Sequence, residues 1–211
     1  MDPLRRFSRY VWLIVSDLPM IGWRRLLPAL VLISVWTALT FLRVPEAKSF
    51  VWACVLAQVA LIWRILPTTV RRQREVTKDF KTNMRVVLTV WLSVLAVQIC
   101  FMNPLISHRV VSIYCGLFII LMVCGAAGDA IFLDRFAPAA KDSNISIAFR
   151  ENILKLQAFV AFLALVVNET LVKLEVPLGA RIAAFSLLPI FLYYFFAIAL
   201  RLTYPPLEEE E

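Results

Sequence analysis

Glu169 is an acidic side chain set among long apolar stretches, near one end of the run at residues 156–172. A carboxylate at a membrane span needs a partner or a function, because burying a charge in hydrocarbon costs about 3 kcal/mol or more. Two kinds of chemistry fit this position: a site for a proton or cation, and a helix-end ion pair with basic residues on the same side of the membrane. The basic candidates are Arg109, Lys173 and Arg181.

Asp129 is the second such carboxylate, and it lies in the small-residue segment 125–130. Small side chains allow helices to approach closely. Asp129 is therefore interpreted in two ways, as a packing contact to a basic loop residue such as Arg72 or Arg85, or as part of a substrate site. The span-four assignment below puts it about one helical turn inside the inner membrane surface.

Gln58 and Gln98 carry polar amides in the middle of two other apolar runs. An amide in hydrocarbon requires a hydrogen-bond partner, and two facing amides satisfy each other. We expect a hydrogen bond between these two side chains, which would contribute modestly to helix packing. The alternative is that they line a polar path through the membrane.

Residues suited to catalysis or metal binding are scarce. His108 is the only histidine and is predicted to lie in a turn, which argues against haem, bis-histidine sites and a histidine relay. The four cysteines all lie in apolar runs and form no Cys-x-x-Cys pair. The motifs of metalloproteases, serine hydrolases and nucleotide-binding loops are missing from the sequence. We expect no cofactor and no enzymatic activity.

The elements that position these residues are predicted to be transmembrane helices. Hydrophobic residues make up 61% of the 211 residues, against about 45–50% in soluble domains. A helix needs about 20 mainly apolar residues to cross the bilayer. The sequence predicts an all-α bundle of about six spans, at residues 26–42, 50–66, 86–106, 110–133, 156–172 and 182–200.

The distribution of basic residues predicts the sidedness of this bundle. With the N-terminus inside, 17 of the 22 lysines and arginines fall on the inner side and 5 on the outer side. Inner loops of membrane proteins carry the excess of positive charge. We therefore expect both ends of the chain on the cytoplasmic or equivalent inner side of an integral, multi-pass membrane protein.

Two loops are distinctive. The outer connection between spans three and four is predicted to be little more than residues 107–109, so those spans should be antiparallel neighbours. The inner segment 67–85, which begins where Pro67 is expected to close span two, is predicted to extend the flanking helices at the headgroups. Its basic residues are candidates for contact with anionic lipid or a partner: Arg71, Arg72, Arg74, Lys78, Lys81 and Arg85.

The ends of the chain form separate regions. Apolar residues recur at helical spacing in the first 25 residues, which indicates an interfacial amphipathic helix on lipid or on a partner protein. Residues 26–200 form the transmembrane domain. Residues 201–211 contain two prolines and four glutamates, and are predicted to be a solvated acidic tail. No internal repeat is recognised along the chain.

These features favour two classes of function. The first is a non-catalytic integral membrane subunit, a scaffold, assembly or accessory component of a larger membrane protein complex. The second is a small carrier, channel or lipid-handling protein that uses Glu169 or Asp129. The net charge of +7 fits anionic headgroups at the basic side, and we expect no nucleic-acid partner. Membrane lipids and other membrane subunits are the expected partners.

Overall fold

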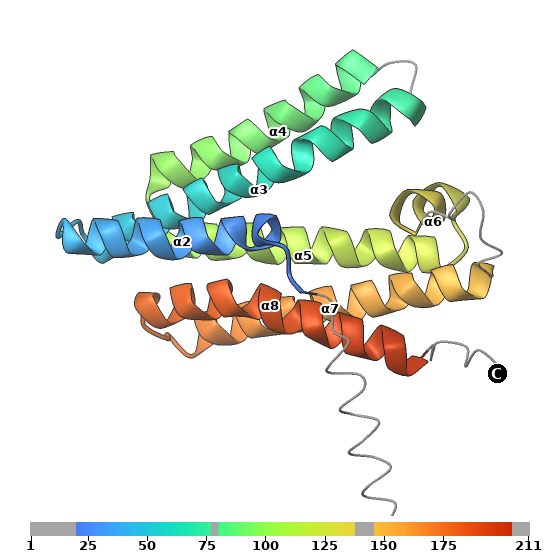
Figure 1. Ribbon diagram of the computed structural model, residues 1–211. Coiled ribbons are helices and arrows are strands. Elements are labelled where there is room, and N and C mark those ends of the chain that lie inside the picture. Colours follow the sequence, from blue (N-terminus) through green and yellow to red (C-terminus); the bar gives the residue numbers. More distant parts are fainter. Residues whose placement is uncertain (1–19, 77–79, 138–145, 204–211) are drawn as a thin grey trace, which may run out of the picture. The chain divides into compact units, whose positions relative to one another are not determined.

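The computed structural model describes residues 20–76, 80–137 and 146–203, and the regular elements in this part of the chain are all helices. The all-α fold is therefore confirmed. Figure 1 shows the helices, which are α2 (Trp23–Phe41), α3 (Glu46–Val76), α4 (Phe80–Phe101), α5 (Pro104–Ala126), α6 (Ala130–Phe136), α7 (Ile147–Lys173) and α8 (Leu178–Thr203). The N-terminal amphipathic segment up to residue 19 and the tail from residue 204 lie outside the described residues.

In the described part of the chain, five helices are long and apolar enough to cross a membrane, so the chain is an integral, multi-pass membrane protein. Their candidate spans are Trp23–Phe41, Glu46–Pro67, Pro104–Ala126, Ile147–Lys173 and Leu178–Leu202. Helix α4 contributes a shorter apolar stretch, Arg85–Phe101.

Helix α3 contains Pro67 and continues to Val76, so the candidate span ends at Pro67 as predicted and the predicted helical extension beyond this proline is confirmed. Two other predicted boundaries are wrong. The turn predicted at residues 107–109 is at residues 102 and 103, because Pro104 begins α5. Proline is favoured at the first position of a helix, where its missing N–H has no acceptor to lose.

The predicted fourth span, 110–133, is two helices rather than one. Helix α5 ends at Ala126, and Gly128 follows with a left-handed backbone, φ 99°. Asp129 then caps α6, since its side chain accepts hydrogen bonds from the backbone N–H groups of Ile131 and Phe132. Glycine after a helix and aspartate before the next are the usual stop and start signals, and here they outweigh the apolar character of the run.

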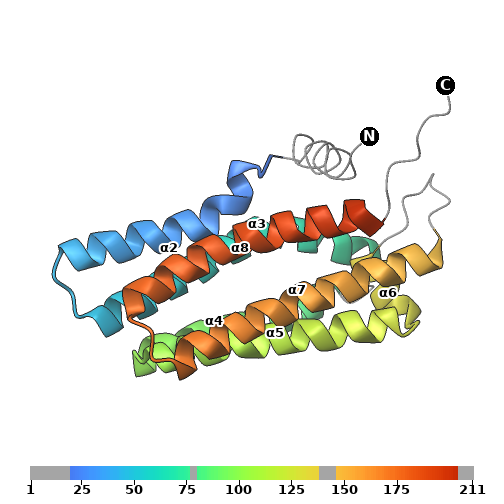
Figure 2. The same ribbon diagram turned by 90° about the horizontal axis from the view of Figure 1, so that it is seen from below.

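The chain folds as two compact units, which are described separately. Unit 2 consists of residues 21–111 and 168–187 and contains the turns that join α2 to α3, α4 to α5 and α7 to α8. Figures 1 and 2 show these three turns at one end of the unit, which we call the turn end. The main core cluster of unit 2 consists of Leu32, Phe50, Ala53, Cys54 and Ile182.

Two of these turns have the same four-residue pattern, Leu-x-Val-Pro, at residues 42–45 and 174–177. In each, the third residue donates back to the helix, Val44 N to Leu39 O at 3.0 Å and Val176 N to Leu171 O at 3.2 Å. The second residue of each pattern, Arg43 or Glu175, has a left-handed φ of 56° or 49°. This is the Schellman ending of a helix. The same type of turn therefore occurs twice in unit 2.

Unit 1 consists, in its described part, of residue 20 with residues 112–137, 146–167 and 188–203. Its core cluster joins α5, α6 and α7 through Met122, Leu133, Ala137, Leu154 and Ala158. A Cβ added at Gly125 would lie 2.7 Å from Leu154 Cδ1, so the Leu154 side chain would have to shift if Gly125 were replaced by a larger residue. Arg150 on α7, 9% exposed, donates through Nε to Ala137 O at 2.5 Å and pairs with Asp134.

Candidate functional site

His108 lies in the second turn of α5, inside unit 2, and not in a connecting turn as predicted. Asn103 places it there: its side chain accepts from Leu105 N at 2.9 Å, and Pro104 starts the helix. His108 is 1% exposed, which makes the only histidine of the chain a buried residue at the turn end. A buried imidazole needs partners for both of its nitrogens.

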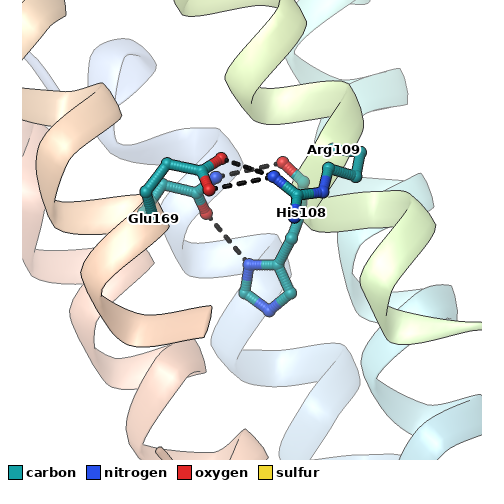
Figure 3. Close-up of polar contacts among 4 residues, drawn as sticks. His108, Arg109 and Glu169 are labelled. Atoms are coloured by element: carbon teal, nitrogen blue, oxygen red, sulfur yellow. Dashed lines mark hydrogen bonds and ion pairs between the residues drawn. The ribbon is translucent and has the colours of Figure 1, made fainter. Parts of the chain in front are cut away.

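Those partners come from α7 and α8. His108 Nδ1 lies 2.9 Å from Asn168 Oδ1, and Asn168 Nδ2 donates to His108 O at 3.0 Å. On the other side of the ring, Arg181 NH1 lies 3.0 Å from His108 Nε2. Figure 3 shows the imidazole of His108 beside the side chains of Arg109 and Glu169. Three helices are therefore joined through one side chain.

The contacts assign the protonation state of the ring. Arginine only donates, so His108 Nε2 must accept from Arg181. The Asn168 nitrogen is used by the His108 carbonyl, so the Asn168 oxygen faces Nδ1 and accepts its proton. His108 is consequently a neutral imidazole with the proton on Nδ1, and neither ring nitrogen is left over for acid–base chemistry.

Aromatic rings enclose His108. Phe50 of α3, fully buried, stacks on the imidazole at 5.1 Å between ring centroids with planes 26° apart. Phe185 of α8 lies at 5.2 Å with planes 49° apart. Trp36 of α2 packs against Phe50 at 6.4 Å between ring centroids, with planes 83° apart. The ring is thus packed as a core side chain, and nearby Ser107 Oγ is buried without a hydrogen-bond partner in the described part of the chain.

Arg109 and Glu169 form an ion pair beside this buried cluster. Arg109 NH1 donates to both carboxylate oxygens of Glu169, at 3.0 and 2.9 Å, as Figure 3 shows. The side chain of Arg109 is 62% exposed and that of Glu169 is 41% exposed. Where water reaches this pair, it screens much of the attraction between the two charges. The structure brings these two predicted partners together, while Arg181 bonds to His108 and to Val176 O instead of to the carboxylate.

Gln58 of α3 and Gln98, in the last turn of α4, face each other. Gln58 Nε2 donates to Gln98 Oε1 at 3.1 Å, and Gln98 Nε2 donates to Gln58 Oε1 at 3.0 Å. Gln98 is fully buried. Each amide therefore satisfies the other, and the pair bonds α3 to α4 within unit 2.

The remaining candidates are placed as follows. Asp129 is used as the cap of α6 and lies at a helix junction, not within a span. Arg85 is exposed on α4. The side chains of Arg71, Arg72, Arg74 and Lys81, and the whole of Lys78, lie outside the described residues. Within the described chain, no group of three or more histidine, cysteine or acidic residues is arranged to hold a metal ion.

Sequence reasoning missed Asn168 and the burial of His108. The signal was present: an amide and an imidazole stand among apolar residues, and polar groups in such positions usually find each other. The wrong turn boundary put His108 in solvent and hid the pairing. Comparisons with protein-family models, with curated proteins and with solved structures found no match.

Proposed function

We propose that this protein is a non-catalytic integral membrane subunit, a scaffold, assembly or accessory component of a larger membrane protein complex. One observation carries the proposal: the side chains best suited to chemistry are bonded to one another across helices. His108 joins α5 to α7 and α8, Glu169 pairs with Arg109, and Gln58 pairs with Gln98. Groups used in this way stabilise a bundle and do not line a path for solutes.

The bundle proposed here has six spans, with α4 as the sixth. Its apolar stretch, Arg85–Phe101, rises about 26 Å at 1.5 Å per residue, slightly less than the ~30 Å of hydrocarbon. Arg85 at one end is exposed and long enough to reach the headgroups. The excess of 17 inner over 5 outer basic residues supports this topology, with both ends inside.

Large exposed apolar side chains supply surfaces for lipid and for other subunits. They include Trp63 on α3, Leu92 and Phe101 on α4, and Phe191 on α8, all between 65% and 77% exposed. Helix α3 extends beyond its apolar part to Val76 and brings Arg71, Arg72 and Arg74 with it. We propose that these, with Lys78, Lys81 and Arg85, contact anionic headgroups or a partner at the inner surface.

The native mass of the protein after gentle detergent extraction from its own membrane tests the proposal. We expect the 24.1 kDa chain to migrate in an assembly several times its own mass, with the same companion subunits in constant ratio. Migration as a monomer or a small homo-oligomer would overturn the assignment as a subunit.

Two substitutions, Glu169→Gln and Asp129→Asn, distinguish the subunit proposal from the alternative that the protein is a carrier. If both carboxylates are structural, each variant lowers assembly yield or thermal stability, and any proton flux in reconstituted vesicles follows the amount of folded protein. A loss of flux with normal abundance and stability would favour the carrier and contradict the subunit proposal.

A further inference from the structure

Arg181 is a buried cation whose recorded bonds go to uncharged acceptors. The residue is 8% exposed, and it donates to Val176 O at 2.5 Å and to His108 Nε2 at 3.0 Å. Among the described residues, no carboxylate oxygen lies within salt-bridge distance of this guanidinium. Buried charges in proteins are normally paired, because an unpaired one loses its hydration without compensation.

The neighbouring groups do not balance this charge. Glu169 is the carboxylate of the cluster, and both of its oxygens bind Arg109. His108 is neutral by its contacts. The cluster of His108, Arg109, Glu169 and Arg181 therefore carries one net positive charge. Arg181 also has five N–H donors, of which its two bonds to the chain use two.

Arg181 is the fourth residue of α8, and the first turn of this helix supplies further donors. The first N–H groups of a helix have no acceptor within it, and they favour a negative charge. Helix α3, which follows the matching turn, supplies that charge itself with Glu46. Helix α8 begins Leu178-Gly179-Ala180 with no acidic residue, and Gly179 and Ala180 are exposed. Of the two matching turns, only the second is followed by a helix with no acidic residue in its first turn.

We propose that Arg181 and the first turn of α8 bind one phosphate-class anion at the turn end of unit 2. The planar fork of arginine matches phosphate geometry, and a helix N-terminus adds backbone donors to the same oxygens. The end of a membrane span lies at headgroup depth, where phospholipid phosphates are the most abundant such anions. A headgroup phosphate or a free phosphate ion would satisfy the same chemistry, and the experiment separates them.

The test uses the full chain purified in an uncharged detergent. Binding is measured by native mass spectrometry with three probes: dioctanoyl phosphatidylglycerol, dioctanoylglycerol and inorganic phosphate. Two variants remove the site in different ways. Arg181→Gln deletes the guanidinium charge, and Ala180→Glu supplies an internal carboxylate without touching the bonds of Arg181. Lys48→Gln is the matched control, because Lys48 occupies in α3 the position that Ala180 occupies in α8.

We expect wild type to bind phosphatidylglycerol, inorganic phosphate or both, and not dioctanoylglycerol. Both site variants should bind about tenfold more weakly, the size of effect that one lost charge-assisted contact gives. Lys48→Gln should stay within about twofold of wild type, the scale of an exposed, screened charge. Binding of phosphatidylglycerol but not of inorganic phosphate identifies a lipid site, and binding of inorganic phosphate but not of phosphatidylglycerol identifies a site for a free anion.

If Arg181→Gln does not fold, the result for Ala180→Glu decides the test. Unchanged binding in Ala180→Glu, equal binding of dioctanoylglycerol, or an equal loss in Lys48→Gln overturns the proposal.

Discussion

The α2–α3 and α7–α8 turns have the same backbone conformation, but different side chains lie at their matching positions. In both, the side chain four residues after the turn proline donates a hydrogen bond to the carbonyl of the turn valine. Ser49 Oγ donates to Val44 O at 3.3 Å, and Arg181 Nε donates to Val176 O at 2.5 Å. On the preceding helices, Trp36 and Asn168 stand at matching positions six residues before the turn. The first hairpin thus places aromatic surface there, and the second places an amide.

The difference shows how one turn type serves two purposes. The first hairpin carries its own Glu46 at the start of α3, packs Phe50 against Trp36, and meets α5 through the stacking of Phe50 on His108. The second hairpin must complete its hydrogen bonds elsewhere, and it does so on His108 of α5. The shared turn sets the positions of the side chains, and the chemistry of these side chains decides how each hairpin contacts His108, by ring stacking or by hydrogen bonds.

The largest expected effect comes from Phe50, through which the first hairpin meets His108. Phe50→Ala would leave a cavity between Trp36, His108 and Phe185, and should lower the free energy of unfolding by on the order of 3 kcal/mol. Thermal unfolding in detergent measures it. Phe191→Ala is the control, since Phe191 is 69% exposed. Equal losses in the two variants would show that Phe50 is not a core residue.

A smaller loss is expected from Asn168, the amide of the second hairpin. Asn168→Leu removes the acceptor of the His108 Nδ1 proton and the donor to His108 O. Leaving buried polar groups unsatisfied costs about 1–3 kcal/mol. The same unfolding assay applies, with Asn152→Leu as control because Asn152 is exposed on the same helix. If the two substitutions behave alike, Asn168 is not a helix-joining residue.

The exposed ion pair should matter less. Glu169→Gln leaves Arg109 with a neutral partner, and we expect a loss of about 0.2–1 kcal/mol that shrinks as salt is raised. Exchanging the charges, Arg109→Glu with Glu169→Arg, should recover most of the loss. A failure of the exchange to recover stability would mean that Glu169 acts through something other than Arg109.

The smallest effect, with opposite sign, concerns the turn itself. Glu175 has a left-handed φ of 49°, which glycine adopts without strain. Glu175→Gly should raise stability by about 0.5 kcal/mol, once the greater chain entropy of glycine is subtracted. Gly128→Ala, in the same motif after α5, should lower it, although no atom would contact the new Cβ. Destabilisation in Glu175→Gly would contradict the assignment of a strained turn.

The sequence was sufficient for the fold class and not for the boundaries. Long apolar runs predict membrane-crossing helices because hydrocarbon requires every backbone group to bond internally. The ends depended on local signals, and two were misread: Asn103-Pro104 starts α5, and Gly128-Asp129 separates α5 from α6. A helix can also pass through a proline near a span end, as α3 does at Pro67.

Two residue pairs of the candidate site could be predicted from the sequence, but the cluster around His108 could not. Opposite charges on one side of the membrane suggested Arg109 with Glu169, and matching depth suggested Gln58 with Gln98. The three-residue cluster of His108, Asn168 and Arg181 required the register of α5 against α7 and α8. Charge alone assigned Arg181 to the carboxylate, whereas the structure gives it an imidazole and a carbonyl.

A double-mutant cycle on His108 and Asn168 tests most directly whether these side chains hold helices together. His108→Phe keeps an aromatic ring between Phe50 and Phe185 while removing both ring nitrogens. Thermal unfolding of wild type, His108→Phe, Asn168→Leu and the double variant gives the coupling free energy. We expect a coupling of about 1–2 kcal/mol, near the upper range for polar contacts between membrane helices. Additive losses with no coupling would contradict a structural role for this polar cluster.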